Sequence, residues 1–156
     1  MKLHLCVVGR LKAGPESALI DDYLTRFERT GRGLSLGPAR VVEVEDRKGG
    51  GQPAEADLLR RAIPQGAAIW ALDERGTLLS SPKFAKGIGN LRDAGSSDLA
   101  FVIGGADGIH PDLRAEVDCS ISFGPMVWPH MLARVMLAEQ LYRAAAILAG
   151  TPYHRA

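Results

Sequence analysis

The sequence has 156 residues and a mass of 16.7 kDa, which is the length of one domain. Its hydrophobic content of 46% is typical of a globular protein with one core and excludes disordered and fibrous classes. Nineteen Lys and Arg residues against 18 Asp and Glu residues leave a net charge of +1, so no overall field draws the chain to nucleic acid or to an anionic membrane. We therefore expect a single domain, 1–156, and any attraction to RNA must be local.

The cysteines and the N-terminus indicate a reduced, cytoplasmic environment. Cys6 and Cys119 lie in separate apolar segments and form no C-x-x-C pair, so neither a disulfide framework nor a metal site is predicted, and both should be inert, buried thiols. The apolar run that begins at Leu3 reaches Gly9 too soon for a signal peptide. No run approaches the roughly 18 apolar residues that a membrane span needs. We expect no membrane partner.

Strand-like and helix-like segments alternate along the chain. Short apolar runs bounded by turn or charged residues predict strands at 2–8, 41–44, 67–72, 99–103 and 119–123. Helical spacing predicts helices at 16–30, at 53–63, from Ser81-Pro82 onward, and at 130–148. This order is typical of an α/β fold with a mainly parallel sheet flanked by helices. The glycine-rich segment 47–52 is the best candidate for a mobile loop.

The last predicted helix, 130–148, is apolar on more than one face. It is therefore either a central helix packed on all sides, or a helix shared between the sheet and a second subunit. The sequence does not decide between these two arrangements.

Ligands of parallel α/β sheets bind outside the carboxyl ends of the strands, and the ends of three predicted strands are unusual. The first passes from Leu72 into charged residues and Gly76. The second runs into Gly104-Gly105, which favours either a tight turn or a flat ligand lying against bare backbone; it matches neither the dinucleotide fingerprint nor a Walker loop. The third leaves through the apolar, proline-restricted segment 124–129, which predicts a pocket or interface loop.

The C-terminal residues Tyr153, His154 and Arg155 offer a stacking ring, an imidazole and a planar cation. Such side chains suit the binding of an RNA base and phosphate. The alternative is a frayed polar tail without a function.

Over its whole length the sequence resembles the ribosomal RNA large subunit methyltransferase H family of the SPOUT class. Each mark is weak alone, but their order is specific: Met1-Lys2-Leu3, Val8-Gly9, Leu72-Asp73 with Gly76, Ile103-Gly104-Gly105 with Asp107-Gly108, Pro129-His130, Arg134-Val135, the run 138–144 (AEQLYRA), and Pro152-Tyr153-His154-Arg155. The chain departs from some relatives at Ala156, where they carry an acidic residue.

The resemblance implies a C-terminal trefoil knot, S-adenosylmethionine as methyl donor without a metal, and a homodimer with the final helix at its interface. It assigns cofactor binding to Leu72, Gly104, Phe123, Gly124, Pro125, Met126, Val127 and Trp128. The candidates for catalysis are Tyr153, His154, Arg155, Arg143 and His130. Arg134 and Glu139 are expected either to pair within the helix or to contact the second subunit.

The activity implied is methylation of N3 of a pseudouridine in helix 69 of 23S rRNA, within the ribosome and not on DNA. The alternative is a non-catalytic ribosome-assembly or RNA-binding module of the same fold. Residues 124–156 carry three basic and one acidic side chain, against 12 and 11 for residues 1–75 and four and six for residues 76–123. Because non-specific affinity scales with the phosphates neutralised, we expect weak binding to naked RNA and dependence on a folded ribosomal target.

Overall fold

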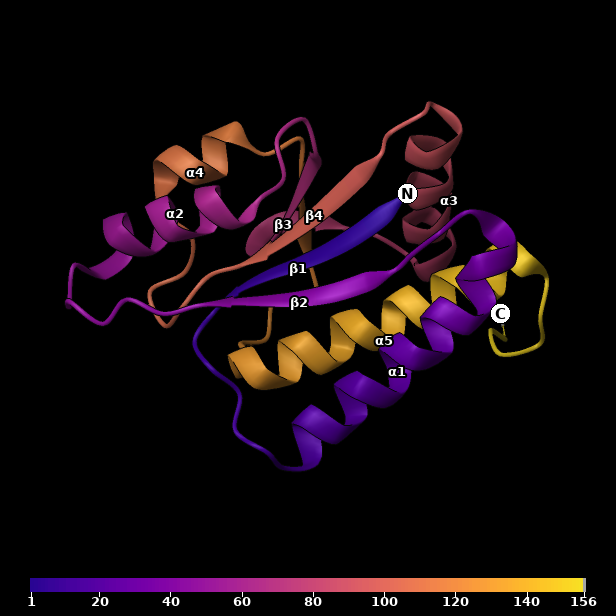
Figure 1. Ribbon diagram of the computed structural model, residues 1–156, viewed down its shortest axis with the longest axis horizontal. Helices are drawn as coiled ribbons and strands as arrows, with labels where there is room; N and C mark the ends of the chain where they lie inside the picture. The colour runs from indigo at the N-terminus through magenta and orange to yellow at the C-terminus, as the bar shows by residue number, and fades with distance from the viewer. Residues whose placement is uncertain (156) are drawn as a thin grey trace.

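The computed structural model describes residues 1–155, and its centre is a five-stranded sheet (Figure 1). The strands follow the order β2-β1-β4-β3-β5, and every neighbouring pair is parallel. Their bounds are β1 Lys2–Val8, β2 Ala39–Val44, β3 Ala68–Leu78, β4 Asp98–Ile103 and β5 Cys119–Ser122. The predicted α/β architecture with a parallel sheet is confirmed.

Helices cover both faces of the sheet. Their bounds are α1 Pro15–Gly31, α2 Gly51–Ala62, α3 Ser81–Asp93, α4 Pro111–Glu116 and α5 His130–Ala149, with a short 3₁₀ turn at Arg32–Leu34. Helices α1, α3 and α5 pack on one face, and α2 and α4 pack on the other (Figure 1). No helix within residues 1–155 is both long and apolar enough to cross a bilayer.

Alternation along the central strands creates the two cores. In β4, Leu99 and Phe101 face the core under α1, α3 and α5, whereas Ala100 and Val102 face α2 and α4. Successive side chains of a strand point to opposite faces, so a continuous apolar run is what a strand covered on both sides requires.

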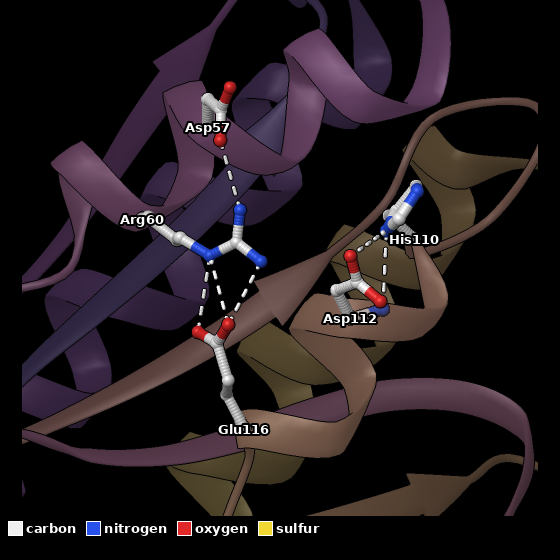
Figure 2. Close-up of polar contacts among 5 residues, drawn as sticks. All are labelled: Asp57, Arg60, His110, Asp112 and Glu116. Atoms are coloured by element: carbon white, nitrogen blue, oxygen red, sulfur yellow. Dashed lines mark hydrogen bonds and ion pairs between the residues drawn. The ribbon is translucent and has the colours of Figure 1, made fainter.

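Helices α2 and α4 differ from the sequence prediction. Helix α2 begins at Gly51, so part of the expected 47–52 loop is helical. Helix α4 was not predicted, because its six residues are too few to show helical periodicity. The chain enters α4 through His110, whose Nδ1 accepts a hydrogen bond from the backbone N–H of Asp112 (Figure 2).

An ion-pair cluster joins α2 and α4 on their side of the sheet. The guanidinium of Arg60 contacts Asp57 on its own helix at 2.9 Å and Glu116 at the end of α4 at 2.9 Å (Figure 2). These side chains are exposed enough that each pair contributes modestly.

Strand β3 is longer than predicted and pairs with β5 before and after a register shift. Ile121 of β5 pairs both with Leu72 and, past a register shift, with Thr77. A Cβ on Gly76 would lie 2.6 Å from the Ile121 backbone, so only glycine permits this approach. The implied knot requires a close passage of this kind, and the knot itself stays a prediction.

Helix α5 is buried along its middle and partly exposed at its start, and sharing of this helix with a second subunit stays a prediction. Its middle is fully buried through residues such as Leu137 and Leu141. Met131 and Leu132, in its first turn, are exposed by 44% and 41%. The helix is central in this chain, but its first turn has apolar surface left for another partner.

Candidate functional site

The three unusual strand ends meet at the carboxyl edge of the sheet. Leu72 pairs with Ile103 of β4 on one side and with Ile121 of β5 on the other. Because all three strands run in parallel, the segments that follow them emerge together. Segments distant in sequence thus form one site.

These segments enclose a cavity of about 540 Å³, called here the edge cavity. Its walls include most of the residues assigned to the cofactor: Leu72, Gly104, Phe123, Gly124, Met126, Val127 and Trp128. His130, a catalytic candidate, also lines it. Pro125 lies outside the lining residues, so the cavity offers no support for a direct role of this proline.

The glycine pair at the end of β4 serves the backbone turn. A Cβ on Gly104 would lie 2.6 Å from the carbonyl carbon of Gly108, which excludes any side chain there. A Cβ on Gly105 would lie 2.9 Å from the carboxylate of Glu55. The tight-turn explanation therefore accounts for Gly104, while its backbone still borders the edge cavity.

Helix α2 supports the glycine turn, a contribution that the sequence prediction missed. Gln52 donates from Nε2 to the carbonyl of Asp107 at 2.7 Å and itself lines the edge cavity. Glu55 lies one turn further along α2, and burial, followed by the charges of Asp107 and Asp46, raises its pKa while His130 lowers it. No local motif marks Gln52 or Glu55, because their role arises only when α2 packs against the loop after β4.

Charged groups of both signs border the edge cavity. Asp73 is nearly buried and lies 3.5 Å from Arg114 of α4, while Glu74 and Asp107 add carboxylates to the walls. Within residues 1–155, no three His, Cys, Asp or Glu side chains are grouped closely enough to hold a metal ion.

The loop after β5 is exposed and apolar, as its composition predicts. The side chains of Met126, Val127 and Trp128 are exposed by 72%, 85% and 43%. They form one wall of the edge cavity and continue into the exposed first turn of α5. Apolar surface concentrated in this way is typical of a binding surface.

The C-terminal tail is docked by a hydrogen-bonded network rather than frayed. Glu139 of α5 accepts hydrogen bonds from Nε of Arg143 at 3.0 Å and from the hydroxyl of Tyr153 at 2.9 Å. Arg143 also contacts Nδ1 of His154 at 3.3 Å and lies 4.8 Å from the Tyr153 ring centroid. Arg155 is exposed. The tail is thus held where three of the catalytic candidates meet.

Burial and the network together set the pKa of Tyr153, and the network orients His154. Burial and then the bond to Glu139 raise the pKa of Tyr153 to about 12, so the phenol is protonated at neutral pH. A guanidinium can only donate, so its contact makes Nδ1 of His154 the acceptor.

The catalytic candidates fall into two groups within one chain. His130 begins α5 beside the edge cavity, whereas Arg143 lies about 20 Å further along the helix at about 1.5 Å per residue. A second cavity of about 430 Å³ lies between them, lined by Glu139 and by Phe123 and Gly124, which also line the edge cavity.

Within this chain Arg134 and Glu139 have different partners, and a contact of either residue with a second subunit stays a prediction. Arg134 reaches across to Glu43 of β2 at 3.1 Å, and Glu139 binds Arg143 and Tyr153. Both pairings lie within this chain, and the two residues do not pair with each other.

The cysteines lie away from this site. Burial raises the pKa of Cys6 to about 11 and also raises that of Cys119, so both thiols stay protonated at neutral pH. Cys119 is half-buried, which corrects the expectation that both are fully buried.

Comparison with known proteins decides the family. A family model described as "Predicted SPOUT methyltransferase" matches residues 1–154. The chain is 74% identical to the ribosomal RNA large subunit methyltransferase H of Dinoroseobacter shibae and 70% identical to that of Ruegeria pomeroyi, covering 99% of each chain. The chain belongs to the ribosomal RNA large subunit methyltransferase H family of the SPOUT class.

Solved structures confirm the SPOUT fold at low sequence identity. A probable methylase family protein from Haemophilus influenzae matches with a TM-score of 0.53 and 13% identity, over 99% of this chain and 70% of that one. TrmJ from Z. mobilis matches with a TM-score of 0.51 and 14% identity, over 90% and 68%. For this methyltransferase family member, these likenesses establish the fold alone.

Proposed function

We propose that this protein transfers a methyl group from S-adenosylmethionine to N3 of a pseudouridine in helix 69 of 23S rRNA, on the assembled ribosome in the cytoplasm. The observation that carries the proposal is the edge cavity. Residues assigned to the cofactor from three separate strand ends line one space there. The names of the relatives, which are ribosomal RNA methyltransferases of the large subunit, support the substrate class.

The edge cavity fits the proposed methyl donor. Its volume of about 540 Å³ lies within the range of roughly 300–1,000 Å³ common for small-molecule sites. The backbone around Gly104 can border a flat base, and Phe123, Met126 and Trp128 supply apolar walls. Glu74 and Asp107 place carboxylates in a site that would receive a sulfonium cation. When bound, the donor supplies an activated methyl group for in-line displacement.

The chain's own residues must hold the acceptor nucleotide and stabilise the charge that forms when its N3 proton leaves. N3 of pseudouridine lies between two carbonyls, so negative charge spreads onto both oxygens as its proton passes to solvent water. The guanidinium of Arg143 and the exposed guanidinium of Arg155 can stabilise that charge. Arg143 contacts Nδ1 of His154. This contact orients the imidazole so that it can position the target nucleobase. Tyr153 stays protonated and fixes the tail through Glu139, so it does not act as the base.

We further propose that the active unit is a homodimer whose site combines residues from two chains. His130 and Arg143 are too far apart along α5 to act on one nucleotide from a single chain. The exposed apolar residues Met126, Val127 and Met131 lie in the loop before α5 and in its first turn, beside His130, and would be covered by a second copy. A partner chain could then bring its tail to the edge cavity.

The test uses ribosomes from a strain that lacks this modification. Incubation with the protein and isotope-labelled S-adenosylmethionine should place one methyl group on the helix 69 pseudouridine, read by mass spectrometry of 23S rRNA fragments. Calorimetry should show binding of S-adenosylmethionine at micromolar protein. Binding to ribosomes without cofactor binding or methyl transfer would instead support the non-catalytic module.

A further inference from the structure

A ridge of arginines, on the C-terminal part of α1 and at the start of the 3₁₀ turn that follows it, lies next to the docked tail. Arg26, Arg29 and Arg32 follow one another at three-residue spacing, and all three are exposed. At about 1.5 Å per residue, they span roughly 9 Å along the helix axis. Residues at this spacing are neighbours on a helix surface, so their guanidinium groups form one patch.

Aromatic contacts join this arginine ridge to the tail. The Arg26 guanidinium lies 5.9 Å from the centroid of the Tyr142 ring, and that ring lies 4.4 Å from the Tyr153 ring. Arg143 covers Tyr153 at 4.8 Å. Figure 1 shows the end of the chain beside the C-terminal end of α1. The ridge and the tail therefore form a continuous surface.

Arg29 and Arg32 form no ion pair with a side-chain carboxylate within residues 1–155, whereas Arg26 is paired. Asp22 pairs with Arg26 at 3.0 Å, and Glu28 is partly buried with its Oε1 accepting a hydrogen bond from the backbone of Ala39. Neither carboxylate is held by Arg29 or Arg32 in these contacts. The exposed carboxylates of Asp21 and Asp22 lie earlier on the same helix, so the unpaired positive charge is that of Arg29 and Arg32.

We propose that Arg26, Arg29 and Arg32 form a phosphate-binding surface that contacts the ribosomal RNA flanking the target nucleotide. The proposal rests on the function proposed above and adds to it the surface that holds the RNA backbone. Planar guanidinium groups bind phosphate oxygens in bidentate geometry. Such contacts position RNA without reading its sequence, so they add affinity while the tail handles the target base.

The alternative, purely structural explanation of the ridge is the helix macrodipole, which favours cations at a helix C-terminus. The two explanations differ in what they predict. A role limited to the dipole requires that removal of the charges lower thermal stability and leave RNA affinity unchanged. A phosphate-binding role requires that removal of the charges weaken RNA affinity and leave thermal stability unchanged.

The experiment compares two double variants that lose equal charge. Arg29→Gln with Arg32→Gln removes two ridge charges and spares Arg26, which contacts Tyr142. Arg40→Gln with Arg61→Gln is the matched control, because both arginines are exposed and lie on β2 and α2 away from the tail. Binding to ribosomes from the unmodified strain is measured by sedimentation at several salt concentrations, together with melting temperature and S-adenosylmethionine affinity.

We expect the ridge variant to bind ribosomes at least tenfold more weakly, and the slope of log affinity against log salt to fall by about two. The control variant should stay within twofold of wild type, and both variants should retain wild-type cofactor affinity. Equal affinities for the ridge variant and the control would overturn the proposal. The binding readout needs no turnover, so a wild-type protein that transfers no methyl group would defeat the proposed function separately.

Discussion

The buried Arg134 of α5 forms an ion pair with Glu43 of β2, which is partly accessible to solvent, and this pair anchors the final helix to the carboxyl edge of the sheet. Arg134 is only 2% exposed, and its guanidinium also donates to the carbonyls of Val8 and Gly9 at 2.7 and 2.8 Å. Glu43 in turn accepts from the backbone of Leu11 at 2.6 Å. The pair therefore ties together the loop after β1, the end of β2 and the start of α5, close to the edge cavity.

Breaking this pair from the carboxylate side should cost more stability than replacing the arginine. Glu43→Ala leaves a buried guanidinium without its counter-ion, which costs about 3 kcal/mol or more. Arg134→Met removes the charge and fills much of the same volume, so we expect a smaller loss of about 1–2 kcal/mol. Urea unfolding of both variants measures the difference, with Glu45→Ala on the exposed surface as control. A larger loss for Arg134→Met would show that the carbonyl contacts dominate.

Substitution of a glycine in the tight turn should lower stability and cofactor affinity, whereas substitution of a glycine in open space should change neither. Gly104→Ala places a Cβ 2.6 Å from the backbone of Gly108. We expect a loss of at least about 2 kcal/mol in stability and a more than tenfold loss of S-adenosylmethionine affinity. Gly33→Ala is the control, because nothing lies within 4 Å of its new Cβ. Calorimetry and thermal melting report both effects, and an unchanged affinity in Gly104→Ala would place the cofactor elsewhere.

The pKa of Tyr153 predicts an alkaline loss of tail docking. Because its folded pKa is raised from 10.0 to about 12, the neutral phenol contributes stability that is complete below pH 10 and is lost as the pH rises toward 12. Tyr153→Phe lacks this titration and should show a flatter stability curve between these values. Turnover should fall at least tenfold at pH 7.5 with unchanged cofactor affinity, because the hydrogen bond to Glu139 is lost. Identical alkaline curves would mean that the phenol does not titrate with docking.

The raised pKa of Glu55 predicts that its ionised form is unfavourable in the fold. The protonated state is favoured by burial, so this carboxyl lowers stability as the pH rises through its pKa. Glu55→Gln mimics the protonated form and should be at least as stable as wild type at pH 7, with the difference shrinking at pH 4. Urea unfolding at both pH values tests this. A clear destabilisation at pH 7 would indicate that the charge is needed, for example by His130.

Truncation after Gly150 should separate folding from turnover. Helix α5 already ends at Gly150, which has the left-handed conformation typical of a helix C-terminus. The shortened chain should keep its fold and its S-adenosylmethionine affinity, measured by circular dichroism and calorimetry, and lose methyl transfer to ribosomes. Full activity would remove Tyr153, His154 and Arg155 from the catalytic candidates.

The sequence by itself determined the fold class, because short continuous apolar runs and helical apolar patterns report directly which segments are buried. It also marked the three strand ends that line the edge cavity, since Leu72, Gly104 and the loop from Phe123 stand out locally. Its resemblance to a family supplied the chemistry. Short elements such as α4 were not predicted, because a six-residue helix shows too little periodicity.

Only the tertiary structure decided how distant residues act together. The contacts of Gln52 with the glycine loop, of Glu43 with Arg134 and of Glu139 with the tail join segments whose spacing in the sequence carries no signal. It also placed His130 and Arg143 at different sites on α5 and brought the arginine ridge of α1 beside the tail. Sequence patterns record whether a residue is buried, whereas the identity of its partners depends on packing between elements.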